Sequence, residues 1–309
     1  MRNKFAEVLY NYSKKNNKIR VVAADISPAG KLAELSKKYP DRFINVGVAE
    51  SSMISMCAGL AMRGLKPFAY TIASFSIFRP FEMVRIDVGY QNLPVVIVGM
   101  GAGTVYSTLG GTHLTQEDVS VVKCLPNFKI LNPCDPLELE ECLKYLCEKN
   151  NSPCYLRIGK AGEKIFTDKS YEKWKFNKPR TIIKGRKNIC LVGTGPIIKL
   201  FFQIKKRLNE KNIHPTIISY HTLKPDNIKE ISKIFKKYKN IITLEDISEI
   251  NGLATTFKIH AFDLKFKGNL SSFSLKDKNI KNYGSQEDLL KSHGITEDKI
   301  ECEILRLSK

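Results

Sequence analysis

The chain has 309 residues, of which 43% are apolar and 26% are charged. This balance permits a packed core and excludes a disordered or collagen-like protein, and the length predicts about two domains of ~150 residues each. The formal net charge of +19 is compatible with a nucleic-acid binder, an anionic substrate or an acidic partner. However, the lysines and arginines are scattered rather than gathered with aromatic residues, which favours solvated faces.

The sequence carries no sign of a metal cluster, a leader or a membrane span. Eight cysteines are spread along the chain without a C-x-x-C pair, which indicates neither a zinc site nor a disulfide framework. Phe5, Val8, Leu9 and Tyr12 lie at helical spacing among polar residues, unlike the continuous apolar core of a signal peptide. No apolar run approaches the ~20 residues that a membrane-spanning helix needs. We therefore expect a cytoplasmic protein.

Short apolar strands alternate with amphipathic helical patterns in the first half of the chain. The expected strands are Arg20–Ala24, Phe68–Thr71, Pro94–Val98, Lys129–Leu131 and Cys154–Ile158. Expected helices begin at Pro80, at Thr115 and at Asp135, where an N-cap precedes a proline and the capping-box residue Glu138. This alternation predicts an α/β fold with three layers, in which helices cover both faces of a mostly parallel sheet.

Residues 159–187 are charged and aperiodic, and they are the best candidate for a domain boundary. A second α/β unit follows. Its expected strands are 188–192, 215–219 and 241–244, and its expected helices are 196–208, 225–238 and 253–262. We therefore expect a first domain over residues 1–165, a linker over 166–186 and a second domain over 187–309.

Three glycine-rich pieces invite a nucleotide-binding interpretation, namely Gly99–Gly103, Gly110-Gly111 and Gly193–Gly195. None of them completes G-x-G-x-x-G or carries the lysine of a P-loop. Strand-to-helix turns explain them without a ligand. The first piece stays open as a ligand site, because α/β sheets bind ligands at the carboxyl ends of their strands.

Glu50 is a single acid that follows an apolar run and starts an expected helix. The common role of such a carboxylate is to satisfy free backbone N–H groups at the helix terminus. Apolar neighbours on both sides indicate burial, which favours the protonated form and suits a proton donor. The helix terminus favours the anion, so the sequence leaves the charge open.

Several motifs occur in the order and spacing of transketolases. The string Asp-Arg-Phe-x-Asn-x-Gly-x-x-Glu, which ends at Glu50, is specific. It is accompanied along the chain by Asp25, Phe75, Gly111-Thr112-His113, Tyr155-Leu156-Arg157, Gly193-Thr194-Gly195, Leu223-Lys224-Pro225 and Glu245-Asp246. Nearly end to end, the chain resembles the C-terminal subunit of a split transketolase, with a pyrimidine-binding domain followed by a transketolase C-terminal domain.

The resemblance implies a transferase that uses thiamine diphosphate to move a two-carbon ketol unit from a ketose or its phosphate to an aldose or its phosphate. It assigns catalysis to Glu50, which hydrogen-bonds N1′ of the aminopyrimidine and activates the cofactor, and to His113, which contacts a cofactor or substrate oxygen. A structural helix cap is the alternative for Glu50, whereas surface or packing roles suffice for the four other histidines, His214, His221, His260 and His293.

The resemblance also implies binding residues. Around the cofactor these are Asp25, Ile72, Phe75 and Phe78, with Phe75 stacked against the pyrimidine ring. Around the substrate they are His113 and Arg157, which grips a sugar phosphate, and the positions of Gly101 and Leu109. Without the family, Asp25 is a loop acid, Phe75 a core residue and Arg157 a solvated strand end.

Four positions depart from the family pattern. Gly101 and Ile247 each replace a histidine, Leu109 replaces an acid that reads a substrate hydroxyl, and Ala29 replaces a phosphate-binding serine. A leucine cannot accept a hydrogen bond, so the change at Leu109 predicts a donor or acceptor other than the usual pentose or hexose phosphate. The change at Ala29 leaves phosphate recognition to Arg157.

The sequence has no Gly-Asp-Gly motif with which thiamine enzymes hold Mg²⁺ and the diphosphate. We therefore expect no metal ligand in this chain and a separate transketolase N-terminal subunit that supplies Mg²⁺ and diphosphate binding, in an α2β2 heterotetramer. We expect neither a nucleic acid nor a membrane as partner. The alternatives are a 1-deoxyxylulose-phosphate synthase-like enzyme, the β subunit of an α-ketoacid dehydrogenase, and a non-catalytic relative.

Overall fold

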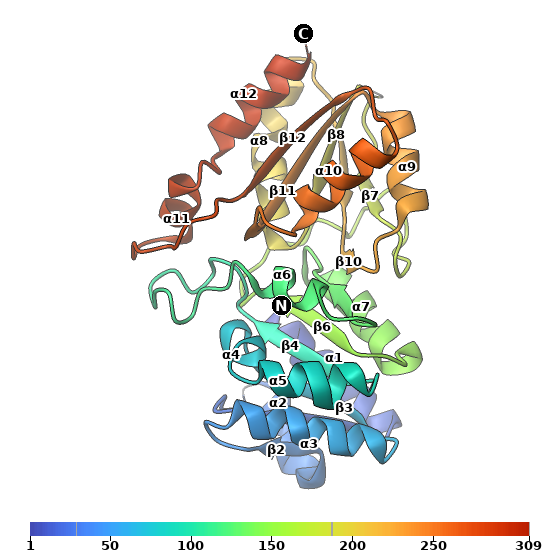
Figure 1. Ribbon diagram of the computed structural model, residues 1–309, viewed down its shortest axis with the longest axis vertical. Helices are drawn as coiled ribbons and strands as arrows, with labels where there is room; N and C mark the ends of the chain where they lie inside the picture. Colours follow the sequence, from blue (N-terminus) through green and yellow to red (C-terminus); the bar gives the residue numbers. More distant parts are fainter. Residues whose placement is uncertain (29, 187, 309) are drawn as a thin grey trace.

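The computed structural model describes residues 1–28, 30–186 and 188–308. It shows two α/β units stacked along the long axis of the molecule, with the N-terminal unit below and the C-terminal unit above (Figure 1). Each unit is a mostly parallel sheet with helices on its faces. The expected α/β class with two layered domains is therefore confirmed. No helix in the described part of the chain is long and apolar enough to cross a membrane.

The first unit is built on a seven-stranded sheet with the strand order β10-β5-β6-β4-β3-β1-β2. Its elements are α1 (Arg2–Lys15), β1 (Ile19–Ala23), α2 (Lys31–Lys38), η1 (Pro40–Arg42), β2 (Phe43–Asn45), α3 (Glu50–Met62), β3 (Lys66–Ile72), α4 (Ala73–Ile77), α5 (Phe81–Met83), η2 (Val84–Tyr90), β4 (Val96–Met100), α6 (Asp118–Lys123), β5 (Lys129–Leu131), α7 (Pro136–Lys149) and β6 (Cys154–Ile158). The helices bury two apolar clusters, one on each face of the sheet.

Two expected helices of the first unit differ from the structure. The helix expected from Thr115 begins at Asp118, because Thr115 forms a short antiparallel bridge with Gly103 and its hydroxyl accepts a hydrogen bond from the Gly103 N–H at 2.8 Å. The helix expected after Pro80 is a single α-turn that continues as the π-helical segment η2. A π-helical insertion of this kind is uncommon and has no signature in apolar periodicity.

The second unit has a five-stranded sheet with the order β12-β11-β8-β9-β7. Its elements are β7 (Arg180–Ile183), β8 (Ile189–Gly193), η3 (Pro196–Ile198), α8 (Lys199–Glu210), β9 (Thr216–Ser219), α9 (Ile228–Lys237), β11 (Asn240–Ser248), α10 (Leu253–Asp263), β12 (Asn269–Leu275), α11 (Gln286–Ser292) and α12 (Glu297–Ser308). The edge strand β7 pairs antiparallel with β9 and lies within the range 166–186 that we expected to be a linker.

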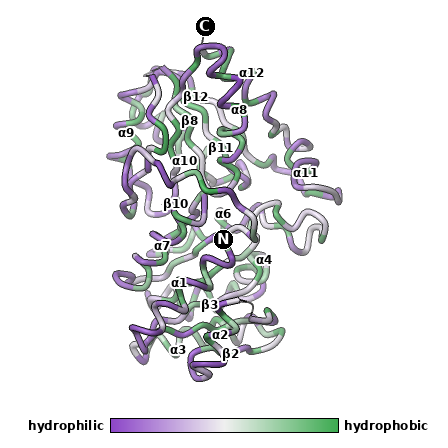
Figure 2. Tube along the Cα trace, turned by 180° about the vertical axis from the view of Figure 1, so that it is seen from behind, coloured by the Kyte–Doolittle hydropathy of each residue, from purple (hydrophilic) through white to green (hydrophobic). Residues whose placement is uncertain are grey.

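The two units share one more strand and one apolar cluster. Strand β10 (Thr222–Lys224) comes from the second half of the chain but pairs antiparallel with β5 at the edge of the first sheet. An apolar cluster continues from Phe128 and Tyr155 in the first unit to Tyr220 and Phe257 in the second. Figure 2 shows hydrophobic residues along the strands of both units and hydrophilic residues on outer helices such as α9 and α12. The two units are therefore packed together rather than merely tethered.

Candidate functional site

Three neighbouring strands of the first sheet, β1, β3 and β4, run parallel and end at the same edge. Asp25 follows β1, Ile72 is the last residue of β3, and Gly101 follows β4. Asp25 is exposed and adopts a left-handed backbone conformation with φ of 53°. Ile72 is half-buried. The structure thus brings these expected site residues to the edge where α/β sheets bind ligands.

Glu50 is the first residue of α3, and only 6% of it is exposed. Its Oε1 accepts a hydrogen bond from Nη1 of Arg79 at 2.9 Å. Arg79 lies just after α4, on the segment that follows β3, and its side chain is 53% exposed. The carboxylate is therefore buried with one cation that reaches it from the solvent side.

Phe75, on α4, lies between the surroundings of Glu50 and those of His113, the two predicted catalytic residues. The Arg79 guanidinium carbon lies 4.3 Å from the centroid of the Phe75 ring. The His113 ring meets the same phenylalanine edge-on, with ring centroids 5.1 Å apart. Phe78, on the same segment as Phe75, is 38% exposed. Side chains from α3, α4 and the loop after β4 are thus brought together, although they are far apart in the sequence.

His113 ends a tight turn in which its N–H donates to the carbonyl of Gly110 at 3.0 Å. Its Nδ1 lies 2.9 Å from the hydroxyl of Thr112, and its ring packs edge-on against Tyr106 with centroids 6.1 Å apart. The imidazole is therefore oriented by contacts on two sides. Such an imidazole can donate to or accept from an oxygen of a bound molecule.

Tyr106 explains the departure at Gly101. Gly101 has a φ of +68°, and a Cβ added there would lie 2.1 Å from a carbon of the Tyr106 ring. The tyrosine ring therefore fills the space that a side chain at position 101 needs. Burial raises the pKa of the Tyr106 hydroxyl. Gly101 itself has no side chain with which to contact a substrate.

An exposed cation, Lys160, lies beside the Tyr106 ring, two residues after the end of β6. Its Nζ lies 5.0 Å from the centroid of the Tyr106 ring. In the part of the chain that the structure describes, no carboxylate forms an ion pair with it. Leu109 is 48% exposed and lies on the same loop as Tyr106 and His113. The side chain of Leu109 on this loop and the ammonium group of Lys160 on the segment after β6 are therefore both exposed to solvent.

Arg157 is placed differently from the prediction. Its side chain is buried; Nε donates to Asp118 at 2.9 Å, and Nη1 donates to Asp246 at 2.7 Å. Nη2 donates to backbone carbonyls. Burial alone lowers the pKa of the guanidinium, but the carboxylates of Asp118 and Asp246 raise it above its ordinary value. All three guanidinium nitrogens are therefore engaged inside the protein, which gives Arg157 a structural role; the expected phosphate contact stays a prediction.

Two departures from the family pattern remain, at Ile247 and Ala29. Ile247 is a fully buried member of the apolar cluster shared by the two units. Ala29 lies outside the described residues. Within residues 1–28, 30–186 and 188–308, no group of three or more His, Cys, Asp or Glu side chains is arranged to hold a metal ion.

Arg79, Tyr106 and Lys160 belong to none of the motifs in the sequence. One signal was available for Arg79, which stands four residues after Phe75, the spacing at which side chains meet on a helical segment. No motif marks Tyr106 or Lys160. The contact between them joins the loop after β4 to the segment after β6, and the Tyr106 ring meets His113 within its own loop.

Arg79 shows what kind of group can contact Glu50 and Phe75 at the same time. A guanidinium is a flat, delocalised group with N–H donors in its plane. Here it lies over the Phe75 ring and donates to Glu50 at the same time. The two residues therefore contact one flat polar group at the same time, as contact with an aminopyrimidine ring would require.

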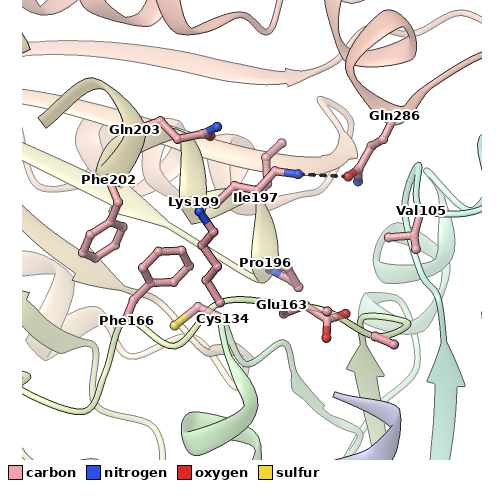
Figure 3. A pocket seen from close by; sticks show the side chains of 13 residues that line it. Val105, Cys134, Glu163, Phe166, Pro196, Ile197, Lys199, Phe202, Gln203 and Gln286 are labelled. Carbon is pink, nitrogen blue, oxygen red and sulfur yellow. Dashed lines mark hydrogen bonds between the residues drawn. The ribbon is translucent and has the colours of Figure 1, made fainter.

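A separate cavity of about 520 Å³ lies between the two units. Figure 3 shows Phe166 and Phe202 beside each other on its wall, and their rings stack with centroids 4.3 Å apart. Across the cavity, the Lys199 ammonium donates to Gln286 at 3.2 Å. None of the site residues expected from the sequence is among the residues that line it.

Comparisons with known proteins agree with this fold. "Transketolase, pyrimidine binding domain" matches residues 1–162, and "Transketolase, C-terminal domain" matches residues 180–300. The 1-deoxy-D-xylulose-5-phosphate synthase of Clostridium beijerinckii is 31% identical over 303 residues, which cover 98% of this chain and 48% of that protein. One of the subunits of the apulose-4-phosphate transketolase of Phocaeicola vulgatus is 28% identical over 253 residues, which cover 82% of this chain and 80% of that protein.

A solved structure described as "Split gene transketolase, inactive beta4 tetramer" has the same fold, with a TM-score of 0.86 at 24% identity over 99% of this chain and 97% of that chain. The two stacked units thus define a chain with a pyrimidine-binding domain and a transketolase C-terminal domain. The chain belongs to the transketolase family, which confirms the resemblance drawn from its motifs. It spans about half the length of the curated synthases that it matches.

Proposed function

We propose that this chain is the C-terminal subunit of a thiamine-diphosphate-dependent transketolase. The enzyme would move a two-carbon ketol unit from a ketose or its phosphate to an aldose or its phosphate. The observation that carries this proposal is the convergence of Glu50, Phe75 and His113, from three separate segments, at one edge of the first sheet.

Each residue has a role that its surroundings support. Phe75 would stack against the aminopyrimidine, with Ile72 and Phe78 beside it, and Glu50 would hydrogen-bond the N1′ atom of that ring. His113 would donate a hydrogen bond to an oxygen of the substrate. When bound, the cofactor supplies the electron sink for cleavage of the carbon–carbon bond. Asp25 would line the same edge, close to where the ring binds.

Lys160 replaces Arg157 as our candidate for the contact to a substrate phosphate. Its ammonium group is exposed and lies beside Tyr106, which packs against His113. Arg157 is enclosed by Asp118 and Asp246. Leu109, on the same loop, would face the part of the substrate where other transketolases read a hydroxyl group, so the substrate pair would differ from theirs.

We further propose that a transketolase N-terminal subunit supplies the Mg²⁺ and diphosphate site, in an α2β2 heterotetramer in the cytoplasm. Two similarities support a separate partner. The relative in Phocaeicola vulgatus is itself named as one subunit of a transketolase and is matched over 80% of its length. The solved relative is described as an inactive tetramer of β chains.

A reconstitution experiment tests the proposal. The purified chain alone should neither turn over nor bind thiamine diphosphate tightly, because half of the cofactor site belongs to the partner. Mixing it with its N-terminal partner and Mg²⁺ should restore ketol transfer from a ketose phosphate. Tight cofactor binding by the isolated chain would contradict the split-enzyme arrangement.

A synthase that condenses pyruvate is the second candidate, because the relative in Clostridium beijerinckii is named as a 1-deoxy-D-xylulose-5-phosphate synthase at 31% identity. The same reconstituted pair separates the two activities. A transketolase consumes a ketose phosphate donor without releasing CO₂, whereas a decarboxylating synthase consumes pyruvate and releases CO₂. Both donors should therefore be assayed with one set of aldose and aldose phosphate acceptors.

A further inference from the structure

Arg79 occupies a place that the proposed chemistry needs for another group. Its Nη1 donates to Oε1 of Glu50 at 2.9 Å, and its guanidinium carbon lies 4.3 Å from the centroid of the Phe75 ring. One flat cation thus satisfies the buried carboxylate and covers the aromatic face beside it. Glu50 has no other side-chain hydrogen bond among the described residues.

A ring that stacks on this face of Phe75 and hydrogen-bonds Glu50 requires the same space as the guanidinium. Stacked flat groups lie in van der Waals contact, so two of them cannot cover one face of one ring together. The Arg79 side chain is 53% exposed, whereas that of Glu50 is only 7% exposed. The arginine therefore has room to turn towards solvent, and the carboxylate does not.

The contact also has a physical reason to form. A buried carboxylate without a partner is strongly unfavourable, and an ion pair with an arginine relieves that cost. An arginine that reaches in from solvent can serve this purpose and still leave, because its own charge is well hydrated once it turns outward. A stacked aminopyrimidine that shares a proton with the Glu50 carboxyl group through N1′ would take over both contacts.

We propose that Arg79 is a positioning residue that holds the Glu50–Phe75 pocket in a closed arrangement and turns outward when the aminopyrimidine ring binds. This inference rests on the proposed function, because it takes Glu50 and Phe75 to be the residues that receive the ring. Cofactor binding then competes with the Glu50–Arg79 ion pair. The apparent Kd for the cofactor rises as the open fraction of the pocket falls.

The variant Arg79→Met tests this competition. Methionine is unbranched and uncharged, so it neither pairs with Glu50 nor covers Phe75 with a flat cation. We expect the Kd of thiamine diphosphate, measured by isothermal titration calorimetry on the subunit pair with Mg²⁺, to fall roughly two- to fivefold, the size expected when one ion pair with an exposed partner is removed. A higher or an unchanged Kd overturns the inference, because it means that Arg79 assists the cofactor or is irrelevant to it.

Two further variants complete the design. Arg85→Met is the matched control, since Arg85 pairs with Glu82 on the surface of the same helical segment and should leave the Kd unchanged. Arg79→Lys keeps a cation for Glu50 but loses the flat stacked group, so its Kd should fall between those of the wild type and Arg79→Met. A Kd for Arg79→Lys above the wild-type value overturns the inference even if Arg79→Met fails to fold. If the wild-type pair does not bind the cofactor at all, the proposed function itself fails.

Discussion

At the scale of single residues, the candidate site depends on one buried carboxylate. Glu50 starts α3, where free backbone N–H groups attract an acid, and this explains its position without any ligand. However, its carboxylate also accepts a hydrogen bond from Arg79, whose guanidinium lies over the Phe75 ring. Glu50 thus has a local role at the helix terminus and a place in the candidate site. A substitution that keeps the shape of the side chain tests the second role.

We expect Glu50→Gln to lower the rate of ketol transfer by the reconstituted pair at least ~100-fold, because an amide cannot exchange a proton as a carboxyl group does. Assembly, followed by size-exclusion chromatography, should not change. The surface variant Glu82→Gln is the matched control, since Glu82 pairs only with Arg85 among the residues that the structure describes. A rate near that of the wild type would remove Glu50 from the mechanism.

Lys160 is expected to decide how tightly a phosphorylated substrate binds. Replacing Lys160 by Met removes one charge-assisted hydrogen bond, so KM for an aldose phosphate should rise about tenfold while KM for the free aldose stays the same. Steady-state kinetics with the two acceptors measure this difference. The exposed Lys169→Met serves as control, and equal changes for both acceptors would show that Lys160 does not contact the phosphate.

At the scale of elements, the start of α7 ties the linker range to the first unit. Asp135 is fully buried and caps the helix by accepting from the Glu138 N–H at 2.8 Å. The same carboxylate accepts from the Phe166 N–H at 2.7 Å and from the N–H and hydroxyl of Thr167 at 2.8 and 2.9 Å. The capping role was evident from Asp135-Pro136 and Glu138, whereas the contacts to residues 166 and 167 join segments about thirty positions apart.

We expect Asp135→Ala to lower the free energy of unfolding by ~2–4 kcal/mol, because it removes the cap and leaves buried donors without an acceptor. Urea unfolding followed by circular dichroism measures this loss. Asp168→Ala changes an exposed acid next to Thr167 and should cost less than ~0.5 kcal/mol. Similar losses in the two variants would show that Asp135 does not fix this segment.

At the scale of the whole molecule, one buried ion network holds the two units together. Arg157 in β6 pairs with Asp118 at the start of α6 and with Asp246 in β11 of the second unit. A Cβ added at Gly103 would lie 2.1 Å from the Asp246 carboxylate, so the close approach requires glycine there. Strand β10 strengthens the same junction by pairing with β5.

We expect Arg157→Met to lower the free energy of unfolding by ~3–5 kcal/mol, because it leaves two buried carboxylates without a cation. Arg207→Met is the matched control, since Arg207 on α8 pairs with three acids of α12 while its own side chain stays 40% exposed, and it should cost no more than ~1 kcal/mol. Calorimetric melting of both variants checks the difference. A loss of phosphate affinity without a loss of stability would return Arg157 to the substrate site.

The sequence by itself determined the α/β class, the alternation of strands and helices, the cap at Asp135 and the family motifs around Glu50 and His113. These features depend on periodicity and on short-range hydrogen bonds, which are written locally in the chain. Only the tertiary structure decided that Arg157 is enclosed, that β10 crosses to the first sheet, and that Arg79 and Tyr106 pack against Phe75 and His113. These outcomes arise only when segments that are far apart in the sequence pack together and exclude water. A local sequence pattern therefore cannot predict them.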